Sequence, residues 1–144
     1  MSEPTGRLEA KHVVVTGAGT GIGRAIAQRL AREGARLTLL ARNLGRLEET
    51  ASLLGDTTVN VAACDITDRA SVDRCFDEAA ANLGPLFGLV ANSGIGGPNE
   101  PGPADRFDEL IATNVTGTYS CLRAAERHLE SHDGARHLVV ISSI

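Results

Sequence analysis

The stretch that decides the fold lies at residues 16–23 and reads Thr-Gly-Ala-Gly-Thr-Gly-Ile-Gly. A run of β-branched residues ends just before it and predicts a strand buried on both faces. Apolar residues at helical spacing, from Ile22 to Leu30, predict a helix directly after it. Glycines between a strand and a helix permit a tight turn, and the helix N-terminus offers free N–H groups to a diphosphate. The stretch therefore predicts a diphosphate-binding turn. The alternative is a turn that only connects two elements.

The rest of the chain alternates short apolar runs with helical patterns. Four further strands are predicted at residues 36–40, 58–64, 86–91 and 137–141. Helices are predicted at residues 44–54, 72–83 and 105–129, the last with a break near Asn114 left open, and residues 92–103 form a Gly/Pro-rich loop. This order predicts an α/β fold, a doubly wound, Rossmann-like parallel sheet of five strands with helices on both faces. Residues 1–144 would form a single domain whose last strand is an unpaired hydrophobic edge.

Composition excludes several classes of protein. The net charge is −4 and aromatic residues are only 3%, which argues against a nucleic-acid partner. No apolar run approaches the ~18 residues of a membrane span. Residues 1–11 contain no apolar signal segment, so a cytoplasmic protein is expected. The three cysteines, Cys64, Cys75 and Cys121, are widely spaced, which predicts buried thiols rather than a metal site or disulfides.

Five motifs share one order and spacing with a known family. They lie at residues 16–23, 64–68, 90–94, 113–117 and 139–143. Together they resemble the short-chain dehydrogenase/reductase family over residues 8–144, with two substitutions in the family's Asn-Asn-Ala-Gly motif at 91–94. The resemblance implies a nicotinamide cofactor and, as substrate, a carbonyl compound or secondary alcohol. It also implies a homo-oligomer, a dimer or a tetramer, for the complete protein.

Several candidate residues fall at the carboxyl ends of the predicted strands, where open parallel sheets bind ligands. The candidates for cofactor binding are Gly17, Thr20, Gly21, Ile22, Gly23, Arg42, Asp65, Ile66 and Asn92. By resemblance, Asp65 and Ile66 contact the adenine and Asn92 the ribose region. Asn114 and Ser143 match the family's catalytic Asn and Ser. Simpler roles remain open: Asp65 as a helix cap, Asn92 as a turn residue, Asn114 as a helix break or cap, and Ser143 as a strand-end hydroxyl.

The end of the second strand favours NADP(H) over NAD(H). An NAD-binding unit usually carries Asp or Glu about 20 residues after the glycine motif, where it holds the ribose 2′-hydroxyl. This chain has Ala41-Arg42-Asn43 there, with no carboxylate to repel a 2′-phosphate and with a guanidinium that can pair with one. Thr20 stands where some NADP-using members carry a basic residue, so that second support is missing. A solvated surface role for Arg42 is the alternative.

The family's Tyr-x-x-x-Lys motif does not follow Ser143 in this sequence. Tyr119 is no substitute, because it precedes the Ser and stands on the preceding helix, and Lys11 starts the first strand at the wrong edge of the sheet. We therefore expect the N-terminal portion of a longer polypeptide. The function expected is that of an NADP(H)-dependent oxidoreductase that transfers a hydride to or from a carbonyl/secondary alcohol substrate. The alternative is a non-catalytic nucleotide-binding module, or a subunit completed by another chain.

Overall fold

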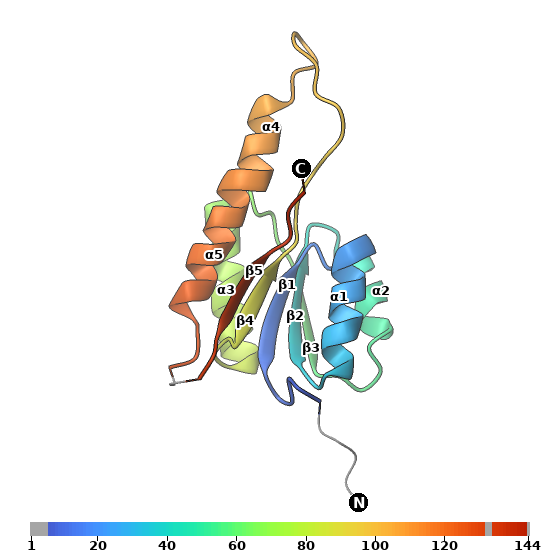
Figure 1. Ribbon diagram of the computed structural model, residues 1–144, viewed down its shortest axis with the longest axis vertical. Helices are drawn as coiled ribbons and strands as arrows, with labels where there is room; N and C mark the ends of the chain where they lie inside the picture. The colour runs from blue at the N-terminus through green and yellow to red at the C-terminus, as the bar shows by residue number, and fades with distance from the viewer. Residues whose placement is uncertain (1–5, 132–133, 144) are drawn as a thin grey trace, which may run out of the picture.

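The computed structural model describes residues 6–131 and 134–143, and its centre is a parallel sheet (Figure 1). The strands, in the order β3-β2-β1-β4-β5, form one five-stranded sheet. Their bounds are β1 His12–Thr16, β2 Arg36–Ala41, β3 Val59–Ala63, β4 Gly88–Ala91 and β5 His137–Val140. All the pairings are parallel, which confirms the predicted doubly wound α/β fold.

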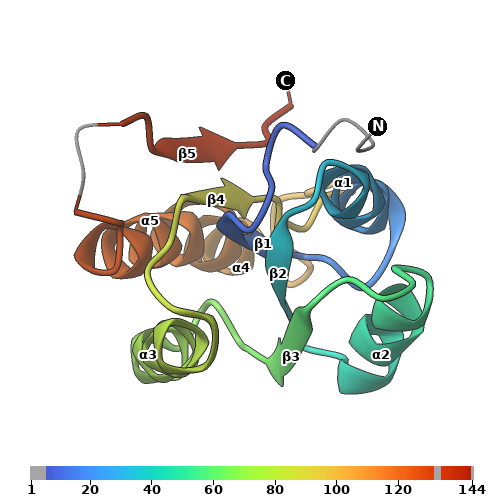
Figure 2. The same ribbon diagram turned by 90° about the horizontal axis from the view of Figure 1, so that it is seen from below.

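The helices cover both faces of this sheet. Their bounds are α1 Gly21–Arg32, α2 Leu44–Ser52, α3 Arg69–Leu83, α4 Phe107–Ile111, η1 Ala112–Gly117 and α5 Thr118–Arg127. Figure 2 shows α1 and α2 on one face, and α3 with the continuous α4–η1–α5 segment on the other. The break near Asn114, which the sequence left open, does not occur: the segment stays helical and widens into one stretch of π-helix, η1, around this residue. None of the helices within the described residues is long and apolar enough to cross a membrane.

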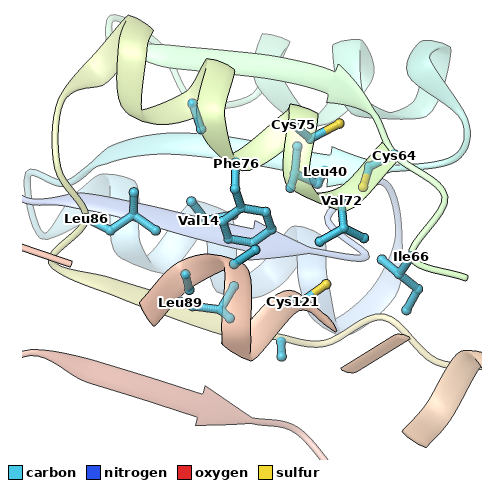
Figure 3. Close-up of a cluster of buried hydrophobic side chains, with 14 residues drawn as sticks. Val14, Leu40, Cys64, Ile66, Val72, Cys75, Phe76, Leu86, Leu89 and Cys121 are labelled. Atoms are coloured by element: carbon cyan, nitrogen blue, oxygen red, sulfur yellow. The ribbon is translucent and has the colours of Figure 1, made fainter. Parts of the chain in front are cut away.

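Two apolar clusters, one on each face, hold the layers together. The larger cluster lies between the sheet and the α3/α5 layer, with the fully buried Phe76 ring at its centre (Figure 3). Val14 of β1 and Leu89 of β4 are within the same cluster. The second cluster packs α1 and α2 against Leu37 and Leu39 of β2. The central strands are therefore buried on both faces, as their non-alternating sequences predict.

The last strand is much more exposed than the others. Strand β5 pairs with β4 along one side, and among the described strands it stands at the edge of the sheet. Leu138, Val139, Val140 and Ile141 are 40–45% exposed. This exposure agrees with the hydrophobic edge predicted from the sequence. Cys64, Cys75 and Cys121 are buried free thiols, also as predicted.

A buried histidine joins three elements at the amino end of β1, the central strand of the sheet. His12 is fully buried, with Nδ1 2.8 Å from the Gly84 carbonyl oxygen and Nε2 2.8 Å from the Thr38 hydroxyl. A carbonyl can only accept, so Nδ1 carries the proton and Nε2 accepts from Thr38. Burial lowers the pKa of His12 below its ordinary value of 6.5. The ring is therefore neutral in the folded protein.

We expect the free energy of unfolding to fall as the pH drops below about 6.5, because the unfolded chain then takes up a proton that folded His12 refuses. Between about pH 7 and pH 5 this single group can remove at most about 2 kcal/mol. Urea unfolding at a series of pH values measures the effect. The variant His12→Asn should be less stable at neutral pH but should have a flatter pH profile. An unchanged profile in this variant would contradict the assignment.

Candidate functional site

Two adjoining pockets open at the carboxyl edge of the sheet. The first has a volume of about 150 Å³ and is lined by Gly17, Ala41, Arg42, Cys64, Asp65, Ile66, Thr67, Ser93, Gly94, Ile95 and Thr113. The second has a volume of about 480 Å³ and is lined by Ile22, Asn92, Ser93, Gly94, Ile95, Gly96, Asn114, Thr118, Val140, Ile141, Ser142 and Ser143. The segment 93–95 borders both. The two pockets flank the boundary between β1 and β4, where the strand order reverses and doubly wound sheets bind their ligands.

Most of the predicted site residues meet in these pockets. The first pocket is lined by Gly17, Arg42, Asp65 and Ile66 of this set, and the second is lined by Ile22, Asn92, Asn114 and Ser143. Thr20, Gly21 and Gly23 line neither pocket and belong to the turn beside them. Sequence analysis did not name Thr67, Ser93 and Ile95 as lining residues. Thr67 and Ser93 lie within the motifs at 64–68 and 90–94, and Ile95 directly follows the second motif, which is the sequence signal that could have indicated them.

The glycine turn requires its glycines at two positions. Gly17 has a φ of +64°, a conformation that favours glycine, and it packs against Asn92 and Ser93. A Cβ at Gly23 would collide with the Gly17 carbonyl oxygen, so only glycine lets the first turn of α1 approach the end of β1. Thr20 is the N-cap of α1, and its side chain makes no capping hydrogen bond. The first N–H groups of α1 thus remain available to an anion.

A threonine hydroxyl ties this turn to β4. Thr16 Oγ1 is buried and accepts hydrogen bonds from the backbone N–H groups of Asn92 at 3.0 Å and Ser93 at 3.1 Å. The side-chain amide of Asn92 donates to the Gly17 carbonyl oxygen at 3.3 Å. Asn92 therefore connects the two strands on either side of the crevice, a larger role than that of a simple turn residue. Its amide oxygen is not used in this contact.

Asp65 and Arg42 lie together on the wall of the first pocket. The Asp65 carboxylate accepts from the Thr67 hydroxyl at 2.7 Å and from the Thr67 backbone N–H at 3.0 Å. These two bonds, followed by the charge of Arg42, lower the pKa of Asp65, which is therefore ionised at neutral pH. The helix-cap alternative for Asp65 is wrong, because α3 is capped by Asp68, which accepts from the N–H groups of Ala70 and Ser71.

Arg42 follows the last residue of β2, and its side chain is exposed. Within residues 6–131 and 134–143 it forms no hydrogen bond and no ion pair. By contrast, seven other arginines among the described residues hold a carboxylate or a backbone carbonyl, at positions 24, 29, 36, 106, 123, 127 and 136. The Arg42 guanidinium is thus available to a ligand.

Asn114 holds the loop that covers the second pocket. It lies in η1, where its Oδ1 accepts from the Ile95 N–H and its Nδ2 donates to the Ile95 carbonyl oxygen, both at 2.8 Å. The paired bonds fix the backbone of the loop beside Ser143. Asn114 is neither a helix break nor a cap. Single π-helical turns inside α-helices frequently occur at functional sites.

The two residues rejected as substitutes for a catalytic Tyr and Lys lie away from this site. Tyr119 is 53% exposed on α5 and lines neither pocket. Lys11 immediately precedes β1, at the opposite edge of the sheet, where its ammonium lies 5.4 Å from the centre of the Phe87 ring. Ser143 lies just beyond β5, in the second pocket with Asn92 and Asn114.

The fold and the crevice define a class: a doubly wound α/β protein with a nucleotide-type glycine turn at its switch point. The family model for short chain dehydrogenases matches residues 11–144. The chain belongs to this family, and the resemblance predicted from its motifs is confirmed.

Similar proteins are known in several bacteria. The chain is 37% identical to 2-(S)-hydroxypropyl-CoM dehydrogenase 3 of Xanthobacter autotrophicus, over 89% of this chain and 52% of that one. It is 40% identical to a hexahydro-indene-carboxyl-CoA reductase of Mycobacterium tuberculosis, over 85% of this chain and 49% of that one.

Solved structures agree with this assignment. A short-chain dehydrogenase/reductase from Serratia marcescens has a TM-score of 0.84 and 32% identity, covering 94% of this chain and 56% of that one. An alcohol dehydrogenase from Thermococcus sibiricus, in complex with 5-hydroxy-NADP, has a TM-score of 0.76 and 34% identity, covering 82% and 52%. The chain therefore spans about half the length of the relatives it matches.

We expect Asn114→Ala to release the loop, because it removes both hydrogen bonds to Ile95. Hydrogen exchange at the Ile95 amide should accelerate by roughly three- to tenfold, as expected for the loss of one net hydrogen bond. Asn99→Ala is the matched control. Asn99 bonds Asp105 and the Arg106 amide in the same loop, so this variant should accelerate exchange at Arg106 and leave Ile95 unchanged. Equal exchange at Ile95 in both variants would contradict the role given to Asn114.

Proposed function

We propose that the chain binds NADP(H) at the carboxyl edge of its sheet and forms the cofactor-binding part of an oxidoreductase. Bound there, the nicotinamide would exchange a hydride with a carbonyl or secondary alcohol substrate. The observation that carries the proposal is Arg42, an exposed guanidinium on the wall of the first pocket, at the end of β2, that forms no hydrogen bond and no ion pair with the described residues. The 5-hydroxy-NADP in the Thermococcus sibiricus relative supports the same choice of cofactor.

The residues around the pockets fit a dinucleotide. Gly17, Gly21 and Gly23 would let a diphosphate approach the turn, with Thr20 and Ile22 at the start of α1 beside it. Arg42 would pair with the 2′-phosphate. Asp65 and Ile66 would contact the adenine from the first pocket, and Asn92 the ribose near the second. The pockets adjoin, so one extended ligand could occupy both.

Ser143 and Asn114 would serve the reaction from the second pocket. The Ser143 hydroxyl would orient the substrate oxygen, and Asn114 would hold a water in the path of the proton. A general acid is also needed, and the family uses a Tyr whose pKa a nearby Lys lowers. We propose that a Tyr and a Lys from outside residues 1–144 complete the site. The substrate itself is not indicated by the lining residues.

A homo-oligomer of the complete protein is part of the same proposal. Phe107, Ile111, Val115 and Tyr119 are all 38–58% exposed and recur every four residues along α4, η1 and α5. A row of large apolar side chains on one helical segment favours association with another copy. The three free cysteines fit the reducing conditions of the cytoplasm, where we propose that the protein acts.

We expect Arg42→Ala to weaken NADPH binding by about 1.5–3 kcal/mol, roughly ten- to a hundredfold, because one charge-assisted pair is lost. NADH has no 2′-phosphate, so its affinity should stay the same. Isothermal calorimetry on the purified protein gives both constants. Arg32→Ala is the control: Arg32 is exposed at the far end of α1 and carries the same charge. The cofactor assignment would be refuted by an Arg42→Ala protein that binds both nucleotides as before.

A turnover assay distinguishes the two candidate functions, an oxidoreductase and a non-catalytic nucleotide-binding module. Residues 1–144 alone should bind NADPH without oxidising it in the presence of aldehydes and ketones, because Ser143 lacks the Tyr and Lys partners. Absorbance at the wavelength of reduced nicotinamide follows the reaction. Turnover by residues 1–144 alone would show that the site needs no further residues. A polypeptide carrying the Tyr and Lys that binds NADPH but never turns over would favour the module.

A further inference from the structure

Arg24 of α1 and Thr50 of α2 form hydrogen bonds to carbonyl oxygens of the glycine turn. Sequence analysis did not single out either residue. The Thr50 hydroxyl is fully buried and donates to the Ala18 carbonyl oxygen at 2.8 Å. The Arg24 guanidinium donates from Nη2 to the Gly19 carbonyl oxygen at 2.7 Å and from Nε to Thr50 Oγ1 at 2.9 Å. We call Arg24 and Thr50 the turn clamp.

The clamp faces away from the two pockets. Neither Arg24 nor Thr50 lines them. The Nε and Nη2 donors of Arg24 are already engaged, since Nε donates to Thr50 and Nη2, besides its bond to Gly19, forms an ion pair with Glu49 at 3.2 Å. The side chain is only 28% exposed. Arg24 is therefore a poor phosphate ligand despite its place on the first turns of α1. Its contacts instead determine how the turn is oriented.

The bonds of the clamp fix the direction of two peptide units. In a trans peptide the carbonyl and the N–H of one unit point in opposite directions, and no described peptide is cis. The Ala18 carbonyl shares a unit with the Gly19 N–H, and the Gly19 carbonyl shares one with the Thr20 N–H. Holding both carbonyls against Arg24 and Thr50 therefore turns both N–H groups away from these two side chains. Within the described residues neither N–H has an acceptor.

The clamp also sets the distance between the turn and α2. Gly19 lies directly against Arg46, where an added Cβ would be 3.1 Å from Arg46 Cβ. Arg46 follows the N-cap Asn43, which in turn follows Arg42. The glycine turn therefore lies beside α2, the helix that begins just after Arg42, the residue expected to bind the 2′-phosphate. A change in the clamp would move the turn relative to this helix.

We propose that Arg24 and Thr50 are positioning residues for nucleotide binding: they orient the Gly19 and Thr20 N–H groups toward the diphosphate and do not touch the nucleotide themselves. This inference rests on the proposed function. The diphosphate is common to NADPH and NADH, so loss of the clamp weakens the binding of both nucleotides by the same factor. Arg42, in contrast, acts on the 2′-phosphate alone.

The test compares Thr50→Val with Thr50→Ser. Valine has nearly the shape of threonine but leaves the Ala18 carbonyl and Arg24 Nε without their partner, whereas serine keeps the hydroxyl. We expect Thr50→Val to raise the dissociation constants of NADPH and NADH about tenfold each, and Thr50→Ser to change them less than about threefold. Arg24→Met should act like Thr50→Val. Glu49→Gln removes only the exposed ion pair and should leave both constants within about twofold.

Calorimetric titration with NADPH and with NADH gives the constants, and near-ultraviolet circular dichroism shows that each variant is folded at the temperature used. If Thr50→Val does not fold, the dissociation constants of NADPH and NADH for Arg24→Met test the inference instead. Folded variants that bind both nucleotides like the unaltered protein overturn the inference, as does a loss confined to NADPH. An unaltered protein that binds neither nucleotide refutes the proposed function itself, so the two failures are distinguishable.

Discussion

The contact between Gly23 and the Gly17 carbonyl oxygen is the constraint on which the rest of the crevice depends. Any side chain at position 23 would collide with that oxygen, so the close approach of α1 to the end of β1 exists only with glycine there. The approach brings the first turn of α1 to the point where β1 and β4 diverge. It also places Gly17 against Asn92, so that one amide side chain can span the two strands.

Polar groups at the carboxyl edge fall into two sets with different partners. One set is satisfied within the protein: Thr16 with Asn92 and Ser93, Asn114 with Ile95, and Thr50 with Ala18. The other set forms no hydrogen bond or ion pair among the described residues, namely the Arg42 guanidinium and the N–H groups of Gly19 and Thr20. Buried polar groups are normally satisfied within the protein. The first set builds the scaffold, and the second set is available to the nucleotide that we propose.

The sequence predicts the strands well because β1 and β2 are non-alternating apolar runs between turn signals. It is less successful where a contact joins distant residues. Asp65 and Asp68 are equally good caps by residue type, and only the geometry of the chain after β3 gives the cap to Asp68. The π-helical turn at Asn114 has no periodic signature over so few residues. The clamp was missed because Arg24 and Thr50 are 26 residues apart, and each by itself resembles an ordinary helical surface position.

The two halves of the crevice rest on strands that differ in how deeply they are buried. The side proposed to bind adenosine rests on β1 and β2, whose side chains are buried under helices on both faces. The side proposed for the reaction rests on β5, where Val139 and Val140 are more than 40% exposed and only β4 lies alongside among the described strands. Burial on both faces fixes the position of Arg42 at the end of β2, whereas Ser143 follows a strand that has a neighbour on one side. Under the proposed function, recognition of the nucleotide and the chemistry at its reactive end therefore depend on different parts of the sheet, and a change in one can leave the other intact.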